Sequence, residues 1–258
     1  MPASATKADP AEAKTPSGSQ TLLRGLDLID AISEGPIALA ELAVRLGLTR
    51  STTHRLASAL IDRRFVTFTP RQGYWLGPKL LELGFLAQKQ ADVVQIARDH
   101  LQTLAAASED TVHLGVRDQD HALYLDKIPG RRRVDISSRI GDRQPMTSTG
   151  LGKALMLDDP ERLWRPHFDA EGNTADYDQW LRRMRQYVAS GFAFDLEENE
   201  DQIRCVAAPI RDTKDSIVAA ISVSSAAQYM SDDRMMSLTK DVLASAHAIS
   251  RDLGWRGR

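Results

Sequence analysis

The stretch LTRSTTHRL at residues 48–56 decides how the first third of the chain is interpreted. Thr49 suits an N-cap, because a threonine hydroxyl can accept a hydrogen bond from a free N–H of the first helical turn. Apolar or small residues then recur three or four apart as far as Leu60, which predicts a helix over Arg50–Arg64 with one buried face. The opposite face of this helix carries arginine, serine, threonine and histidine.

Two further helices precede this one, and a hairpin follows it. Leucine and isoleucine at helical spacing predict a first helix that ends at Gly35-Pro36. Apolar residues between 39 and 46 predict a second helix, and Gly47 supplies the left-handed turn that ends it. The runs FVTF at 65–68 and YWL at 74–76 predict a β-hairpin. Together these elements predict a winged helix-turn-helix.

Length and composition exclude several classes of protein. The chain has 258 residues, of which 42% are hydrophobic and 26% charged, so one large or two modest domains with buried cores are expected. Cys205 is the single cysteine, which excludes an internal disulfide and makes a thiolate zinc cluster unexpected. No apolar run approaches the ~18 residues of a membrane span, and no signal peptide is recognisable. A cytoplasmic protein without membrane association, metal or cofactor is predicted.

The formal net charge of −2 hides a difference between two parts of the chain. Residues 19–90 hold nine Lys and Arg against six Asp and Glu, a balance of +3. Residues 91–258 hold 22 against 27, a balance of −5. Because phosphate binding usually leaves a basic footprint, this pattern favours a small basic module joined to a larger acidic one.

Four segments are predicted along the chain. Residues 1–18 hold three prolines and little to bury, which predicts a disordered tail. The winged helix-turn-helix domain takes residues 19–77, and a linker helix over 78–91 begins at Pro78, with an apolar stripe that continues to Leu104. Residues 92–258 predict an α+β domain. Its expected strands span 111–117, 122–128, 134–138, 204–211 and 217–225, and its expected helices span 150–157, 180–190 and 232–253.

The outer face of the helix over Arg50–Arg64 has the chemistry of a DNA reader. In a helix-turn-helix the contacting side chains concentrate near the N-terminus of the second helix of the motif. Arginine makes bidentate contacts to guanine, and serine and threonine hydroxyls bond phosphates or bases. The predicted DNA-binding residues are Arg50, Ser51, Thr52, His54 and Arg55, with Arg71 at the hairpin tip reaching the backbone or minor groove. The alternative is that this helix is an ordinary capped helix with a solvated face. The basic run Arg131-Arg132-Arg133, in the other half of the chain, is interpreted as a solvated turn.

Long motifs in the correct order resemble the IclR family of bacterial transcriptional regulators. The motifs are LTRSTTHRL at 48–56, GYWLGPKLLELG at 73–84, SSRIG at 137–141, PMTSTGLGKA at 145–154, GFAFDLEE at 191–198, CVA at 205–207 and IRD at 210–212. The resemblance implies an N-terminal winged helix-turn-helix joined by a linker helix to a GAF-like α/β effector-binding domain. It also implies homodimers or homotetramers that bind double-stranded operator DNA and regulate nearby catabolic genes.

The resemblance further implies a small-molecule effector site in the C-terminal domain. Matching positions give its residues as Met146, Gly150, Leu151, Asp195, Cys205, Ser222 and Ser224. Two departures from the family pattern are Arg211 and the segment Thr149-Gly150-Leu151. Backbone amides at a helix start attract an anion, and the alternation in 222–224 points both serines to one face. Together with an acidic acceptor these groups favour a small hydroxylated organic acid, a sugar acid or keto acid.

Other interpretations of the same residues stay open at this point. Cys205 could be a core cysteine, the serines a strand-end pair, and Asp195 an ordinary capping residue. An enzyme acting on a small acid could use Cys205 as nucleophile, or Asp195 and Glu198 as an acid/base pair, although no histidine lies near Cys205 in sequence. A second domain that only forms oligomers is a third possibility. Activator and repressor are equally compatible with the sequence.

Overall fold

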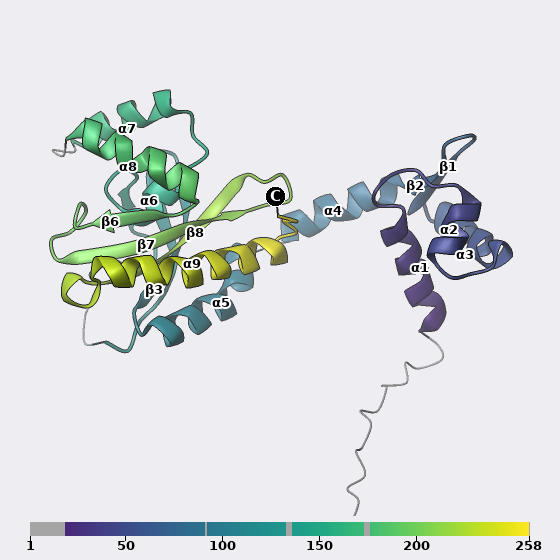
Figure 1. Ribbon diagram of the computed structural model, residues 1–258, viewed down its shortest axis with the longest axis horizontal. Coiled ribbons are helices and arrows are strands. Elements are labelled where there is room, and N and C mark those ends of the chain that lie inside the picture. The colour runs from purple at the N-terminus through teal and green to yellow at the C-terminus, as the bar shows by residue number, and fades with distance from the viewer. Residues whose placement is uncertain (1–18, 91, 133–135, 173–175, 258) are drawn as a thin grey trace, which may run out of the picture. The chain divides into compact units, whose positions relative to one another are not determined.

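The computed structural model describes residues 19–90, 92–132, 136–172 and 176–257 (Figure 1). They form two compact units, which divide between Gln90 and Ala91, next to the predicted boundary between linker and effector domain. Each unit has its own hydrophobic core. The predicted tail over 1–18 lies outside the described residues. Among those described, no helix is both long and apolar enough to cross a membrane.

The first unit packs helices and a hairpin around a small core. α1 (Gln20–Ala31), α2 (Leu39–Arg45) and α3 (Arg50–Asp62) come first, followed by the antiparallel strands β1 (Val66–Thr69) and β2 (Gly73–Leu76) and then by α4 (Pro78–Gln90). The core takes residues from the helices and from both strands, namely Leu28, Ile32, Ile37, Leu42, Ala57, Val66 and Tyr74. This arrangement confirms the predicted winged helix-turn-helix.

A glycine allows the hairpin to dock against the connection between α1 and α2. Ile37 and Tyr74 form an antiparallel bridge, with backbone hydrogen bonds of 3.0 and 2.9 Å. Gly73 has a φ of +106°, and a Cβ at this position would lie 2.3 Å from the carbonyl oxygen of Ile37. Any other residue here would strain the backbone and clash with Ile37, so this position requires glycine.

The second unit is a six-stranded antiparallel sheet with helices on both faces. The strand order is β5-β4-β3-β8-β7-β6. The strands are β3 (Thr111–Asp118), β4 (His121–Ile128), β5 (Arg143–Pro145), β6 (Ala193–Leu196), β7 (Ile203–Arg211) and β8 (Ile217–Ala226). The helices are α5 (Val93–Ser108), α6 (Gly150–Leu155), α7 (Trp164–Ala170), α8 (Tyr177–Ser190) and α9 (Asp232–Asp252), with 3-10 turns at Glu161–Leu163 and Ala227–Tyr229.

Two cores lie on opposite faces of this sheet. α5 and α9 cover one face, and α6, α7 and α8 lie on the other (Figure 1). Along β3, Val112 and Leu114 pack in the core beneath α5 and α9. His113 between them points to the α6 side, as the alternation of side chains along a strand requires. The chain thus has the predicted α+β organisation.

The predicted apolar stripe from residue 78 to 104 forms two helices. α4 ends at Gln90 and α5 begins at Val93. Asp92 is the N-cap of α5, and its carboxylate accepts a hydrogen bond from the N–H of Val94 at 2.9 Å. The boundary lies next to the end of the linker helix predicted over 78–91, and the apolar stripe continues across it because an aspartate cap starts a new helix without interrupting the stripe.

The expected strand over 134–138 is absent from its described part. Residues 136–138 form no strand, and Val134 and Asp135 lie outside the described residues. The Nζ of Lys127 donates hydrogen bonds to the carbonyls of Ile136 and Ser138 at 2.5 and 2.7 Å, so a side chain takes acceptors that a strand would have used. β5, β6 and α7 are present without having been predicted.

Candidate functional site

α3 presents a polar and partly basic face to solvent. Thr49 Oγ1 accepts a hydrogen bond from the N–H of Thr52 at 3.2 Å, which caps the helix as predicted. Thr53 and Ala57 are fully buried, and they fix which face points inward. Thr52 is half-buried, and the other predicted DNA-binding residues of the helix are exposed, namely Arg50, Ser51, His54 and Arg55.

The two arginines of this face are available to a ligand. Within the described part of the chain, neither Arg50 nor Arg55 forms an ion pair. Arg64 just beyond the helix, by contrast, pairs with Glu82 at 2.9 Å. Unpaired guanidinium groups at a helix N-terminus can bind phosphates or guanine edges without first breaking a salt bridge.

The hairpin presents Arg71 at its tip. Arg71 is exposed and has a φ of +71°, in the left-handed region that tight hairpin loops use. Trp75 Nε1 donates a hydrogen bond across the hairpin to Thr69 Oγ1 at 3.1 Å. Phe68 and Trp75 keep about half of their surface exposed, at 50% and 42%. The hairpin therefore carries both a basic tip and apolar flanks.

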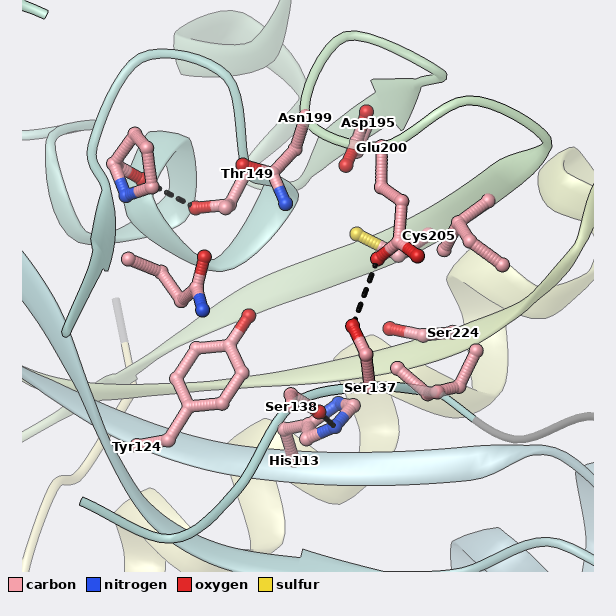
Figure 2. Close-up of a pocket in the computed structure, with 14 residues that line it drawn as sticks. His113, Tyr124, Ser137, Ser138, Thr149, Asp195, Asn199, Glu200, Cys205 and Ser224 are labelled. Carbon is pink, nitrogen blue, oxygen red and sulfur yellow. Dashed lines mark hydrogen bonds between the residues drawn. The ribbon is translucent and has the colours of Figure 1, made fainter. Parts of the chain in front are cut away.

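The second unit contains a cavity of ≈ 370 Å³ on the α6 side of the sheet (Figure 2). This volume lies within the range of small-molecule sites. Two carboxylates line the cavity, from Asp195 and Glu200, and the described lining includes no lysine or arginine. The lining residues are His113, Tyr124, Ile136, Ser137, Ser138, Gln144, Pro145, Thr149, Asp195, Asn199, Glu200, Ile203, Cys205 and Ser224.

Cross-strand pairing builds the floor of the cavity from residues far apart in sequence. Asp195 of β6 stands opposite Cys205 of β7, and Cys205 stands opposite Ser224 of β8. Ser224 in turn pairs with Thr111 of β3. Directly opposed side chains on one face of an antiparallel sheet lie about 5 Å apart, so these four form a polar row across the sheet. Three predicted effector residues are thus brought together.

The remaining predicted effector residues are buried beside the cavity, outside its lining. Met146 and Leu151 belong to the core beneath α6, α7 and α8. Ser222 lies two residues before Ser224 on the same face of β8 and is 1% exposed. A Cβ on Gly150 would lie 2.5 Å from Cys205 Sγ, so this glycine lets α6 approach the floor.

The acid at the end of the polar row has an unusual proton affinity. Burial raises the pKa of Asp195 to about 6, while the positive charge of Lys153 acts in the opposite direction. The backbone N–H of Glu198 donates to Asp195 Oδ1 at 2.8 Å. Lys153 is 1% exposed and is held by Glu198 and by the carbonyl of Phe194. Asp195 is therefore both anchored and able to take up a proton near neutral pH.

Three further groups of the cavity, from Cys205, His113 and Tyr124, are held neutral. Burial raises the pKa of Cys205 to about 12, and burial lowers the pKa of His113 to about 3. Burial also raises the pKa of Tyr124, so its phenol keeps the proton. His113 Nε2 lies 2.7 Å from Ser138 Oγ. The floor thus presents hydroxyl, thiol and imidazole groups without charge.

These values do not favour the enzyme alternative. A nucleophilic cysteine needs a lowered pKa or an adjacent base, whereas the thiol of Cys205 is buried and protonated. Glu198 is committed to Lys153 and to Arg183, which lies 3.2 Å away. In the described ranges, no group of three or more His, Cys, Asp or Glu side chains is placed to hold a metal ion.

Several lining residues were not predicted from the sequence. Thr149 carries a detectable signal, because its Oγ1 caps α6 by accepting from the N–H of Gly152 at 2.9 Å. His113 shares a face with Thr111, which alternation along that strand indicates. The other polar ones lie in strands or loops without a local motif for binding, namely Tyr124, Ser137, Ser138, Gln144, Asn199 and Glu200.

A winged helix-turn-helix with an exposed, partly basic α3 face in one unit and a separate α+β unit that holds a polar cavity define a class, the two-domain DNA-binding proteins of the helix-turn-helix type. Comparison with known proteins gives the family. The model for the IclR helix-turn-helix domain matches residues 21–70, and the model for the C-terminal domain of the bacterial transcriptional regulator IclR matches residues 85–251. The chain belongs to the IclR family and is a DNA-binding transcriptional regulator.

Relatives of known function are similar along nearly the whole chain. The DNA-binding transcriptional repressor YiaJ of Escherichia coli is 32% identical over 96% of this chain and 92% of its own length. The transcriptional repressor IclR of the same organism is 31% identical over 95% and 94%. The crystal structure of Pseudomonas aeruginosa HmgR has the same fold, with a TM-score of 0.81 at 24% identity over 93% of this chain and 100% of that one. YiaJ and IclR are both named as transcriptional repressors.

Proposed function

We propose that this regulator reads operator DNA through α3 and the hairpin, and that a small organic acid bound in the cavity controls it. The observation that carries the proposal is the contrast between two exposed arginines of α3, which form no ion pair with any described residue, and a polar cavity in the other unit. Arg50 and Arg55 take base and phosphate contacts, Ser51, Thr52 and His54 add hydrogen bonds, and Arg71 contacts the neighbouring backbone or minor groove.

The groups of the cavity support a hydroxylated acid as effector. Asp195 accepts hydrogen bonds from ligand hydroxyls, and Ser224 can bind a hydroxyl or a carboxylate oxygen. No basic side chain of the described lining neutralises a ligand carboxylate, so neutral donors hold it. Such a site discriminates by hydrogen-bond geometry more than by charge, which suits a sugar acid or keto acid.

Exposed apolar surface supports a homodimer or homotetramer. On α1, Leu22, Leu23 and Leu26 are 64%, 43% and 49% exposed. Apolar side chains clustered on a solvent face usually mark a protein interface. A symmetric pair of the first units would place two α3 helices on related half-sites of an operator.

The names of similar proteins support a role in repression of catabolic genes. YiaJ and IclR are named repressors, and a Salmonella typhimurium relative, 32% identical, is named acetate operon repressor. In this scheme the effector binds more tightly to the conformation with low DNA affinity and releases the operator.

The DNA assignment is tested by fluorescence anisotropy with DNA from upstream of the protein's own gene. Arg50→Ala and Arg55→Ala are each expected to weaken specific binding by roughly 5- to 150-fold, because a bidentate arginine contact contributes about 1–3 kcal/mol. Arg182→Ala, which removes an exposed arginine of α8, is the matched control and leaves binding unchanged. Normal operator binding by both α3 variants would overturn the residue assignment.

The effector assignment is tested by thermal unfolding of the full chain with sugar acids, keto acids and aromatic acids. A ligand that binds only the folded state raises the unfolding temperature by mass action. An acid that stabilises the protein is expected also to change its affinity for operator DNA. If no acid stabilises the protein, control by an organic acid is excluded.

A further inference from the structure

We infer that Tyr124 is a specificity-determining residue that hydrogen-bonds the end of the effector remote from Asp195, so that the cavity selects a polyhydroxylated acid of several carbons. This inference rests on the proposed function, because it concerns the ligand of the same cavity. It adds a second polar wall to the floor of Asp195, Cys205 and Ser224.

The side chain of Tyr124 lines the cavity, and its hydroxyl is accessible from the cavity. The residue is 8% exposed, and among the described residues its Oη forms no hydrogen bond. Figure 2 shows the phenol oxygen pointing into the cavity from the wall opposite Asp195. A hydroxyl that faces a cavity without a hydrogen bond to the protein is free to bond a ligand there.

A β-bulge aims this side chain. The pairing of β3 with β4 shifts register between Leu114 and Gly115, so Tyr124 stands opposite Gly115 while Asp126 stands opposite Leu114. As a result Asp126 turns to the other face of the sheet and meets Arg98 of α5 at 3.2 Å. Without the bulge, alternation would place both side chains on one face. Bulges that re-aim a side chain are common beside functional sites.

Neighbouring groups keep the tyrosine in position as a neutral donor. Its ring packs beside that of His113, with centroids 5.0 Å apart. Backbone hydrogen bonds fix its strand on the outer side, from the N–H of Tyr124 to the carbonyl of Asp142 at 3.0 Å and from the N–H of Gly141 to the carbonyl of Tyr124 at 2.8 Å. Gln144 of β5 lines the same wall, and its amide also forms no hydrogen bond in the described part of the chain.

The distance between the two walls indicates the length of the ligand. Tyr124 lies on β4 and Cys205 on β7, with β3 and β8 between them. Three strand spacings of about 4.8 Å separate their backbones by roughly 14 Å, of which the tyrosine side chain covers part. The cavity of ≈ 370 Å³ is also far larger than a molecule of two or three carbons requires. An extended acid with hydroxyls along its chain reaches both walls.

The test measures affinities of the full-length protein by isothermal titration calorimetry. The probes are glycerate, threonate and gluconate, which are hydroxy acids of increasing length, and pyruvate as a short keto acid. Affinity is expected to rise with chain length in the wild type. Tyr124→Phe, which removes only the hydroxyl, should bind gluconate roughly 3- to 10-fold more weakly and bind glycerate and pyruvate unchanged.

A second tyrosine provides the matched control. Tyr187 of α8 is 6% exposed and lies outside the cavity lining, so Tyr187→Phe should leave all affinities unchanged. Equal gluconate affinity in wild type and Tyr124→Phe, or binding of pyruvate alone, would overturn the role of Tyr124 and leave an acid-controlled regulator intact. If none of the four acids binds the folded wild-type protein, this inference fails together with control by a sugar acid or keto acid, while operator reading through α3 is decided by its own test.

Discussion

The two units of the molecule place their polar groups in opposite ways. In the first unit the polar side chains assigned to DNA stand on the surface of α3, and the described core is apolar apart from Thr53. The second unit buries charged groups such as Asp110, Lys153 and Asp195. Surface recognition costs little stability, whereas a buried polar site must be held by partners. The second unit is therefore expected to be the more sensitive to loss of a single polar group.

The largest effect is expected at Asp110, whose side chain is 0% exposed. It accepts hydrogen bonds from Arg132 Nε at 2.8 Å and from Arg234 Nη2 at 2.5 Å, and thereby joins the start of β3 to the loop after β4 and to α9. Asp110→Ala leaves both guanidinium groups without this carboxylate and should lower the free energy of unfolding of the second unit by about 3–5 kcal/mol. Urea denaturation followed by tryptophan fluorescence measures it.

An exposed aspartate serves as the control for this prediction. Asp201 lies on the surface, and in the described part of the chain no ion pair involves it, so Asp201→Ala should change stability by less than about 0.5 kcal/mol. Operator binding by the first unit should be the same in both variants wherever the protein is folded. An equally small cost for Asp110→Ala would remove the basis of the comparison.

Asp195 is expected to make the stability of the second unit depend on pH. Its pKa is raised from 3.8 to about 6 in the folded protein, so the folded state favours the protonated acid more than the unfolded state does. Ionised Asp195 therefore lowers the free energy of unfolding by the full amount above pH 6. This destabilisation disappears as the pH falls from about 6 to 4. The shift corresponds to about 2–3 kcal/mol. The titratable groups that interact with this carboxyl are Lys153, Glu198, Cys205, Tyr124 and Tyr187.

Asp195→Asn removes the titration and keeps an acceptor for the N–H of Glu198. The free energy of unfolding of the variant minus that of the wild type should be about 2 kcal/mol greater at pH 8 than at pH 4.5. Urea denaturation at both pH values gives the numbers. A stability difference that does not change with pH would show that Asp195 titrates normally.

The next largest effect on stability is expected at Gly150, which packs closely against the polar row. A Cβ on Gly150 would lie 2.5 Å from Cys205 Sγ, so Gly150→Ala should destabilise the second unit by about 2 kcal/mol. In a Cys205→Ala background the same substitution should cost far less, because the sulfur is gone. Gly84→Ala in α4, where no atom lies within 4 Å, is the control and should be neutral or stabilising. Thermal unfolding of the wild type and of the four variants measures these costs. Equal costs of Gly150→Ala in both backgrounds would contradict the packing argument.

The sequence predicts the two units unequally well. α3 and its exposed residues follow from the spacing of apolar residues and from one cap, because a helix places its functional face within a few consecutive positions. Ser222 and Ser224 share a face for a similar reason. Periodicity also locates most of the central strands.

The rest of the site depends on pairing that no local pattern records. Asp195, Cys205 and Ser224 meet because β6, β7 and β8 adopt one register, and the family resemblance indicates those residues without showing the register. Tyr124 escapes prediction because a bulge reverses the alternation after it. The Ser137-Ser138 segment escapes because the side chain of Lys127, rather than a strand, binds the carbonyls of Ile136 and Ser138.

The smallest effect tests the comparison most directly, because both units begin a helix with the same cap. Thr49 Oγ1 accepts from the N–H of Thr52 at 3.2 Å in an exposed position, whereas Thr149, 3% exposed, accepts from the N–H of Gly152 at 2.9 Å and donates to the carbonyl of Pro145 at 2.6 Å. Thr49→Ala should cost about 1 kcal/mol, because water can replace the hydroxyl. Thr149→Ala leaves two buried groups without a partner and should cost about twice as much. Urea denaturation of each variant gives the ratio of the two costs. Near-ultraviolet circular dichroism and operator binding separate the unfolding transitions of the two units. Equal costs would mean that burial adds nothing to the second cap.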